Sequence, residues 1–218
     1  MKKRTLPRLL PIICRILLCI LPVGAGGYAA GADLKISLHD AAGKPVKEAV
    51  VSFTPDQGAE IGAHLKQKPY IMAQQGLNFA PHVLIIPKGA QVQFPNRDTV
   101  SHHVYSFSPV HAFQFPLYGP KLARSERFDK PGTVALGCNI HDSMSAYIRV
   151  VDTPYFALSD DSGTVTLTGL PQARGRLDIW QPLLATPENL VSQSVTPVGQ
   201  SLNLALKMRR PAKVPEAY

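Results

Sequence analysis

The sequence predicts an all-β protein, and three observations lead to this class. The chain of 218 residues contains 20 prolines and 16 glycines, and few of its stretches repeat apolar residues with the period of a helix. Short segments rich in β-branched and aromatic residues recur along the chain instead. Gly, Pro, Asp and Asn separate these segments, and this spacing is typical of a β-sandwich or β-barrel.

Ten segments are expected to be strands, each because β-branched or aromatic residues stand between turn-forming residues. In chain order, the first five cover residues 33–40, 48–55, 82–87, 90–96 and 102–108. The second five cover residues 132–138, 145–152, 163–170, 175–182 and 201–208. We find no internal repeat and no low-complexity segment.

The N-terminus has the layout of a secretory signal peptide over residues 1–32. Basic residues precede an apolar run at about 9–23, and Ala30 and Ala32 fit the small-residue positions of a cleavage site before Asp33. A membrane anchor is the alternative, but the run is short and Arg15 interrupts it. We therefore expect an exported, periplasmic protein that is free of the membrane after cleavage.

Cleavage would change both the charge and the cysteine count. Five basic residues and no acid leave with residues 1–32, so the net charge falls from +8 to +3, and the basicity does not indicate nucleic-acid binding. Cys14 and Cys19 leave as well, so that Cys138 has no partner for an intramolecular disulfide in an oxidising compartment. A lone thiol there is either buried and inert or bound to something.

The stretch "LGCNIHDSMSAY" favours bound metal, because Cys138, His141 and Met144 follow one another at intervals of three. The preceding segment alternates, so Val134 and Leu136 share a face with Cys138. If that face is the core, a tight loop at 139–144 brings the imidazole and the thioether back toward the sulfur. The pair His102 and His103 can supply a fourth ligand, and alternation alone does not choose between them.

A thiolate, two imidazoles and a thioether form the ligand set of a type 1, or blue, copper site. Zinc seldom takes a thioether, and a binuclear copper centre needs two bridging thiolates. We therefore expect one mononuclear copper ion.

Residues 69–152 resemble a cupredoxin of the plastocyanin, pseudoazurin and amicyanin type. The stretch "YIMAQQGLNFAPHVLIIPKGAQVQFPNRD" is similar to the opening of that family, and Cys-x-x-His-x-x-Met has the short ligand loop of amicyanin. The wider pattern, including "HHVYSFS", "GCNIHD" and "VVDTPYFA", resembles periplasmic methylamine-utilisation proteins. The resemblance implies His102, Cys138, His141 and Met144 as copper ligands.

Two positions depart from the family pattern. His103 stands where the family commonly has asparagine after the ligand histidine, and Ile140 stands where plastocyanin-like loops often have proline. The Ile140 N–H is therefore free to donate to the Cys138 sulfur, which would raise the reduction potential.

The segments on either side resemble a carboxypeptidase-regulatory-like, transthyretin-like sandwich. "DAAGKPVKEAVVSFTP" matches its opening and "SDDSGTVTLTGLPQARGRLDIWQP" its closing half. The predicted architecture is a cupredoxin sandwich or barrel inserted in, or packed beside, this second sandwich. Its outer parts cover residues 33–68 and 153–210, followed by a tail at 211–218; one extended sandwich is the alternative.

The expected function is one-electron transfer rather than enzymatic catalysis. The partner would be a cytochrome-like protein or a dehydrogenase, which the sequence does not identify. The main alternative is a protein that delivers copper as cargo. Two other functions fit less well: an enzyme that uses the Cys138 thiol as nucleophile with His141 as base, and a structural sandwich whose ligands are vestigial. The remaining histidines are expected to be structural or surface residues, with His111 the one that could approach the site.

Overall fold

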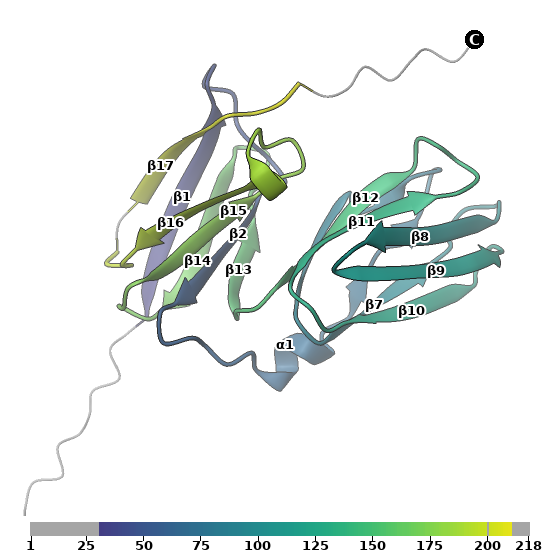
Figure 1. Ribbon diagram of the computed structural model, residues 1–218, viewed down its shortest axis with the longest axis horizontal. Coiled ribbons are helices and arrows are strands. Elements are labelled where there is room, and N and C mark those ends of the chain that lie inside the picture. Colours follow the sequence, from purple (N-terminus) through teal and green to yellow (C-terminus); the bar gives the residue numbers. More distant parts are fainter. Residues whose placement is uncertain (1–30, 200, 211–218) are drawn as a thin grey trace, which may run out of the picture.

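The computed structural model describes residues 31–199 and 201–210, and these residues form a nearly all-β protein (Figure 1). The predicted signal peptide, apart from its last two residues, and the tail at 211–218 lie outside the described residues. The predicted cleavage point after Ala32 lies within them, and Ala32 is the first residue of strand β1. None of the described helical segments has the length and hydropathy of a membrane span.

The strands fall into two lobes that lie side by side in Figure 1. We call the first the central lobe; its strands are β3 (Tyr70–Ile71), β4 (Ala73–Gln74), β5 (Phe79–Ala80), β6 (Val83–Pro87), β7 (Ala90–Pro95), β8 (His102–Ser108), β9 (His111–Tyr118), β10 (Ala123–Phe128), β11 (Gly132–Cys138) and β12 (Ser145–Val151). We call the second the flanking lobe; its strands are β1 (Ala32–Asp40), β2 (Val50–Pro55), β13 (Tyr155–Leu158), β14 (Thr164–Leu170), β15 (Gly175–Trp180), β16 (Leu190–Val195) and β17 (Ser201–Leu206). Two short helical turns, α1 (Ala63–Gln67) and η1 (Pro187–Asn189), complete the fold.

The central lobe is a sandwich of two main sheets. A five-stranded sheet of order β6-β12-β11-β8-β9 faces a three-stranded sheet of order β10-β7-β3, and β4 and β5 form a small hairpin beside them. The inward residues of both sheets meet in one apolar cluster that includes Phe94, Phe128 and Ile148, all fully buried. Burying these alternating side chains is the main force that holds the two sheets together.

The flanking lobe has its own core between a sheet of order β14-β1-β17 and a sheet of order β13-β2-β15-β16. The chain leaves this lobe after β2 and returns to it at β13, which pairs with β2 in an antiparallel register from Tyr155↔Phe53 to Leu158↔Val50. The central lobe is thus inserted between two neighbouring strands of the flanking lobe. The predicted all-β class, with one sandwich set into another, is confirmed; the transthyretin-like identity of the flanking lobe and the boundaries at 68/69 and 152/153 stay predictions.

The two lobes meet on the outer face of the five-stranded sheet, at its β6 and β12 side. Trp180 of the flanking lobe is 1% exposed, and its ring packs edge-on against Tyr147 with 5.6 Å between centroids. The Arg149 guanidinium lies 5.9 Å from the centroid of the same indole. Across the same interface, His82 Nδ1 lies 3.1 Å from a carboxylate oxygen of Glu48.

Candidate metal centre

Cys138 is the last residue of β11 and points into the core of the central lobe, as the alternation predicts. Val134, Leu136 and Cys138 are 0%, 4% and 4% exposed, and Cys138 pairs with Val104 of the neighbouring strand β8. Within the described residues Cys138 is a free cysteine. The thiol therefore lies at a fixed place, at the end of a strand that is hydrogen-bonded on both sides.

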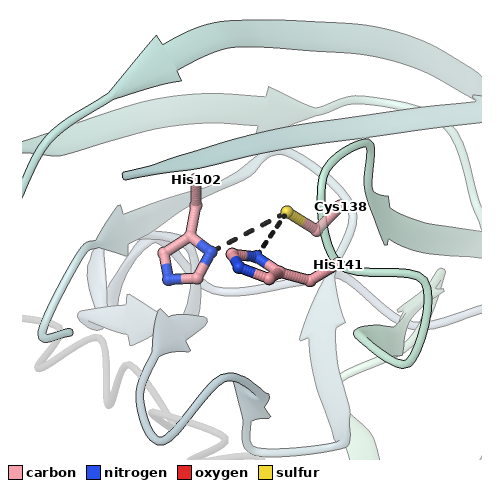
Figure 2. A group of neighbouring side chains, drawn as sticks. All are labelled: His102, Cys138 and His141. Atoms are coloured by element: carbon pink, nitrogen blue, oxygen red, sulfur yellow. Dashed lines mark hydrogen bonds between the residues drawn. The ribbon is translucent and has the colours of Figure 1, made fainter. Parts of the chain in front are cut away.

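His102 is the first residue of β8 and is fully buried on the same inner face. Its Nδ1 lies 3.7 Å from Cys138 Sγ (Figure 2). The adjacent His103 is on the opposite face of β8 and does not belong to the cluster that the described residues form. The structure thus places His102 beside the thiol and His103 away from it, because an inward residue and its neighbour in a strand point to opposite faces.

The loop at 139–144 brings His141 back to the sulfur. The Met144 N–H donates to the His141 carbonyl at 3.0 Å and the Asn139 N–H donates to the His103 carbonyl at 3.2 Å, which holds both ends of the loop. His141 Nδ1 then lies 3.6 Å from Cys138 Sγ, and the two imidazole centroids are 5.0 Å apart. Met144 is 1% exposed and belongs to the same buried cluster as Cys138.

These distances fit a shared metal ion. Two ligand atoms at about 2.3 Å (sulfur) and 2.0 Å (nitrogen) from one ion, at an angle of about 110–120°, are about 3.5–3.8 Å apart. The two observed Sγ to Nδ1 distances of 3.7 and 3.6 Å lie in this range, and all three ligand atoms lie within 4.8 Å of one another. The donor atoms are therefore already spaced as ligands of one ion would be.

Asp98, which the sequence reasoning did not single out, fixes the orientation of His102. Its Oδ2 accepts from His102 Nε2 at 2.8 Å, and the carboxylate also accepts from the N–H groups of Gly76 at 2.6 Å and Leu77 at 3.1 Å. Because a carboxylate only accepts, the proton of the neutral ring lies on Nε2. His102 Nδ1 is thereby left with a free lone pair that faces the sulfur, as a metal ligand requires.

The surroundings of Asp98 favour its charged form. Its side chain is 11% exposed, and this burial by itself raises the pKa. The hydrogen bonds from the Gly76 N–H, the His102 ring and the Leu77 N–H outweigh burial and bring the pKa below its usual value. A negative carboxylate therefore contacts Nε2 of His102, on the side of the ring away from the sulfur, and makes Nδ1 a better electron donor.

A buried network of hydrogen bonds lies next to His102 and Asp98 in the central lobe. The buried Tyr118 pairs with His102 across β8 and β9, and its hydroxyl contacts Gln74 Oε1 and, at 3.0 Å, the Phe94 carbonyl. Burial raises the pKa of Tyr118 far above its usual value, so the phenol stays neutral. Asn96 Oδ1 accepts from the Asp98 N–H at 3.0 Å, which ties the loop that carries Asp98 to the same network.

Two possibilities that the sequence raised are not seen among the described residues. Ile140 is 50% exposed, and the described residues contain no hydrogen bond from its N–H to Cys138 Sγ; the hydrogen-bond contacts of that sulfur are the two imidazole nitrogens. His111 does not approach the site, because it pairs with Ser108 at the end of the β8–β9 hairpin opposite to His102. It contacts Glu126 instead, with Nε2 2.8 Å from a carboxylate oxygen.

Comparison with known proteins gives structural similarities only. No family model matches the chain, and neither does any curated protein. A single-residue mutant of amicyanin in its reduced Cu(I) form is 20% identical with a TM-score of 0.37, over 46% of this chain and 98% of that one. A purple cupredoxin from Nitrosopumilus maritimus is 19% identical with a TM-score of 0.35, over 38% and 99% of the two chains.

A copper-containing nitrite reductase from Thermus scotoductus SA-01 is 29% identical with a TM-score of 0.38. The match covers 45% of this chain but only 25% of the reductase. The listed solved structures that are similar to part of this chain therefore include amicyanin and a purple cupredoxin. The resemblance to methylamine-utilisation proteins stays a prediction.

Proposed function

We propose that this chain is a periplasmic type 1 copper protein that carries single electrons. Cys138, His102 and His141 would hold the ion, with Met144 as a weaker fourth ligand. The observation that supports this most strongly is the convergence of two imidazole Nδ1 atoms on one buried thiol, at 3.7 and 3.6 Å. Bound copper would supply a Cu(II)/Cu(I) couple, because the sulfur donors favour Cu(I) and the imidazoles also suit Cu(II).

The protein's contribution is to hold the ligands still. His102 and Cys138 lie on neighbouring paired strands, and Asp98 fixes the His102 ring through Nε2. Their positions therefore depend on the packed sandwich and not on the oxidation state of an ion. A site that rearranges little on gain or loss of an electron exchanges electrons with a small barrier, which is what a carrier requires.

The surface near the site supports transfer to another protein. Exposed apolar side chains are clustered in the loops that surround His102 and His141: Ile140 is 50% exposed, Val100 42% and Leu77 47%. Leu77 and Val100 are held there through Asp98 and Asn96, whose side chains bond to their backbones. We expect a redox partner protein to dock on this surface, close to the partly exposed His141, because transient redox complexes use small apolar patches.

The test is to add Cu(II) to the purified chain without residues 1–30 and record visible and EPR spectra during reduction and reoxidation. We expect an intense thiolate-to-copper band at one copper per chain, lost on reduction and regained on oxidation. Cys138→Ser should abolish the band. Weak colour and rapid loss of copper to a chelator would contradict the carrier and indicate delivery of copper as cargo.

A pair of methionines provides the matched control. Met144 and Met72 are both buried in the same core cluster, at 1% and 0% exposure. Met144→Leu should shift the spectrum and the reduction potential, whereas Met72→Leu, with the same change in a similar environment, should leave both unchanged. Equal behaviour of the two variants would remove Met144 from the ligand set.

A further inference from the structure

Most of the exposed apolar residues of the described chain lie around the metal centre. Four loops meet there, at 75–78, 96–101, 119–122 and 139–144, and we call them the metal-end loops. Seven large apolar residues are exposed among the described residues, and five of them lie in or next to these loops: Leu77, Val100, Leu117, Leu122 and Ile140. Apolar residues gathered at one end of a molecule, and not scattered singly, indicate a contact surface.

Hydrogen bonds hold the metal-end loops together. The Asn96 N–H donates to the Leu122 carbonyl at 2.8 Å, and the Lys121 N–H donates to the Asn96 carbonyl at 2.9 Å. The Arg97 N–H donates to the Gln74 carbonyl at 2.9 Å, which joins the second loop to the small hairpin of β4 and β5. Strands β9 and β11 end on the side of the central lobe away from the flanking lobe (Figure 1). A partner can therefore reach this preformed surface without meeting the flanking lobe.

Three cations stand beside the apolar residues. Arg97 and Lys121 lie in the metal-end loops, Arg124 is the second residue of β10, and all three are exposed. Within the part of the chain that the structure describes, none of them forms an ion pair. The Arg124 guanidinium lies 5.8 Å from the ring centroid of Tyr118, the residue that pairs with the start of β8. These cations are thus free to pair with the carboxylates of another molecule.

The acids of the metal-end loops do not balance these cations. The loops contain Asp98 and Asp142. The Asp98 side chain is 11% exposed, and its carboxylate is already bonded to the His102 ring and to two backbone N–H groups. Asp142 is exposed, so one negative charge faces three positive charges at this surface. The potential over the apolar residues is therefore positive.

We propose that this surface binds a redox protein whose own contact face is acidic. The proposal rests on the carrier function proposed above and names the kind of partner that the carrier meets. The apolar residues supply the contact at the centre, and carboxylates of the partner pair with the three cations at its edge. Opposite charges at the edge of an interface speed up encounter and orient the two proteins.

Two other polyanions fit this surface less well. Juxtamembrane segments that recognise anionic lipids cluster about four to eight cations, and this surface has three. Nucleic acid is bound through a series of phosphate contacts along its backbone, whereas the centre of this surface is apolar. A folded protein with carboxylates around an apolar centre matches both features at once.

The first test is an NMR titration of the metal-free chain without residues 1–30, with cytochrome b5 as a probe whose haem edge is surrounded by acids. Cross-peaks of the metal-end loops should shift on binding. The Kd should rise with salt, because a Debye length of about 10 Å at 0.1 M screens exposed charges. This measurement does not depend on copper.

A triple variant shows whether the three cations are responsible. Arg97→Gln, Lys121→Gln and Arg124→Gln together should raise the Kd for cytochrome b5 at low salt at least about tenfold. The matched control is Lys44→Gln, Lys66→Gln and Lys130→Gln, which removes the same charge from exposed lysines outside the metal-end loops. The control should bind within about twofold of the parent chain.

Stopped-flow kinetics of the copper-loaded chain supply a second measurement. The rate of electron transfer from reduced cytochrome b5 should fall as salt is added, whereas the rate from mitochondrial cytochrome c, which is basic at its haem edge, should rise. The sign of the salt dependence is compared and not the absolute rate, because the two cytochromes differ in reduction potential.

Three results would overturn the proposal. They are equal weakening in both triple variants, salt dependences of the reversed sign, and binding to phosphatidylglycerol vesicles without binding to cytochrome b5. A chain that binds cytochrome b5 through the three cations but does not cycle between Cu(II) and Cu(I) would support the acidic partner and remove the carrier function alone. Failure of the partner and failure of the carrier are therefore told apart.

Discussion

Replacing Asp98 with asparagine should weaken copper binding although Asp98 touches no metal. The carboxylate accepts three hydrogen bonds, from His102 Nε2 at 2.8 Å and from the N–H groups of Gly76 and Leu77 at 2.6 and 3.1 Å. Asparagine keeps one acceptor oxygen and replaces the other with an NH₂ group. Whichever way the amide is turned, its NH₂ faces at least one of these donors.

The size of the effect follows from what is lost. The negative charge behind His102 disappears, and the ring loses the fixed partner that holds its proton on Nε2 and its Nδ1 lone pair toward the sulfur. Loss of such an outer contact typically costs about 10–100-fold in metal affinity, or about 1.4–2.8 kcal/mol. We expect Asp98→Asn to weaken Cu(II) binding by this factor.

Competition titration against a chelator of known affinity measures the change, with Asp142→Asn as the control. Asp142 is an exposed acid in the ligand loop itself, so its replacement removes the same charge near the site without removing a contact to His102. If both variants lose affinity equally, or if Asp98→Asn binds like the parent, Asp98 does not orient the ligand and the reasoning is wrong.

Three further predictions concern the ligands, the fold and the metal. His102→Ala should abolish the blue band, whereas His103→Ala should keep one copper per chain; copper content and the visible spectrum separate them, and loss of copper in both would contradict the geometric choice. Gly163→Ala should lower the free energy of unfolding by at least about 2 kcal/mol, because its φ is +73° and a Cβ would lie 2.3 Å from the Leu38 carbonyl oxygen. Gly43→Ala, with φ +79° and open space, should cost only about 1 kcal/mol in the same denaturant titration, so equal costs would refute the clash. Copper at about a hundredfold excess over Kd should stabilise the chain by about 2.7 kcal/mol in thermal unfolding, and an unchanged Tm would mean that copper does not bind the native fold.

The sequence predicted best those elements whose signal is local. Strands β8 and β11 begin and end where the alternation and the flanking turn residues place them. Strands β9 and β10 were not expected. In β9 the residue Pro116 interrupts an alternating run, and β10 (ARSERF) is polar and largely exposed, so the pattern of a half-buried strand is broken in β9 and absent in β10.

In the metal centre, too, the sequence predicts the residues whose signal is local and misses the residue whose role depends on distant contacts. Cys138, His141 and Met144 are close in sequence, so their spacing suffices to predict them. Asp98 could not be found this way, because its role depends on contacts with Gly76 and Leu77, more than twenty positions earlier in the chain. From the sequence alone, an acid in a polar loop looks like an ordinary turn residue, and only the fold shows that this one contacts Nε2 of His102.

The central claim is that Cys138, His102 and His141 share one copper ion. A crystal structure of the copper-loaded chain, with diffraction recorded above and below the copper absorption edge, tests it directly. We predict a single strong anomalous peak within bonding distance of Cys138 Sγ and of Nδ1 of both histidines. A peak at any other place, or a loaded crystal with no peak among these three atoms, would contradict the claim.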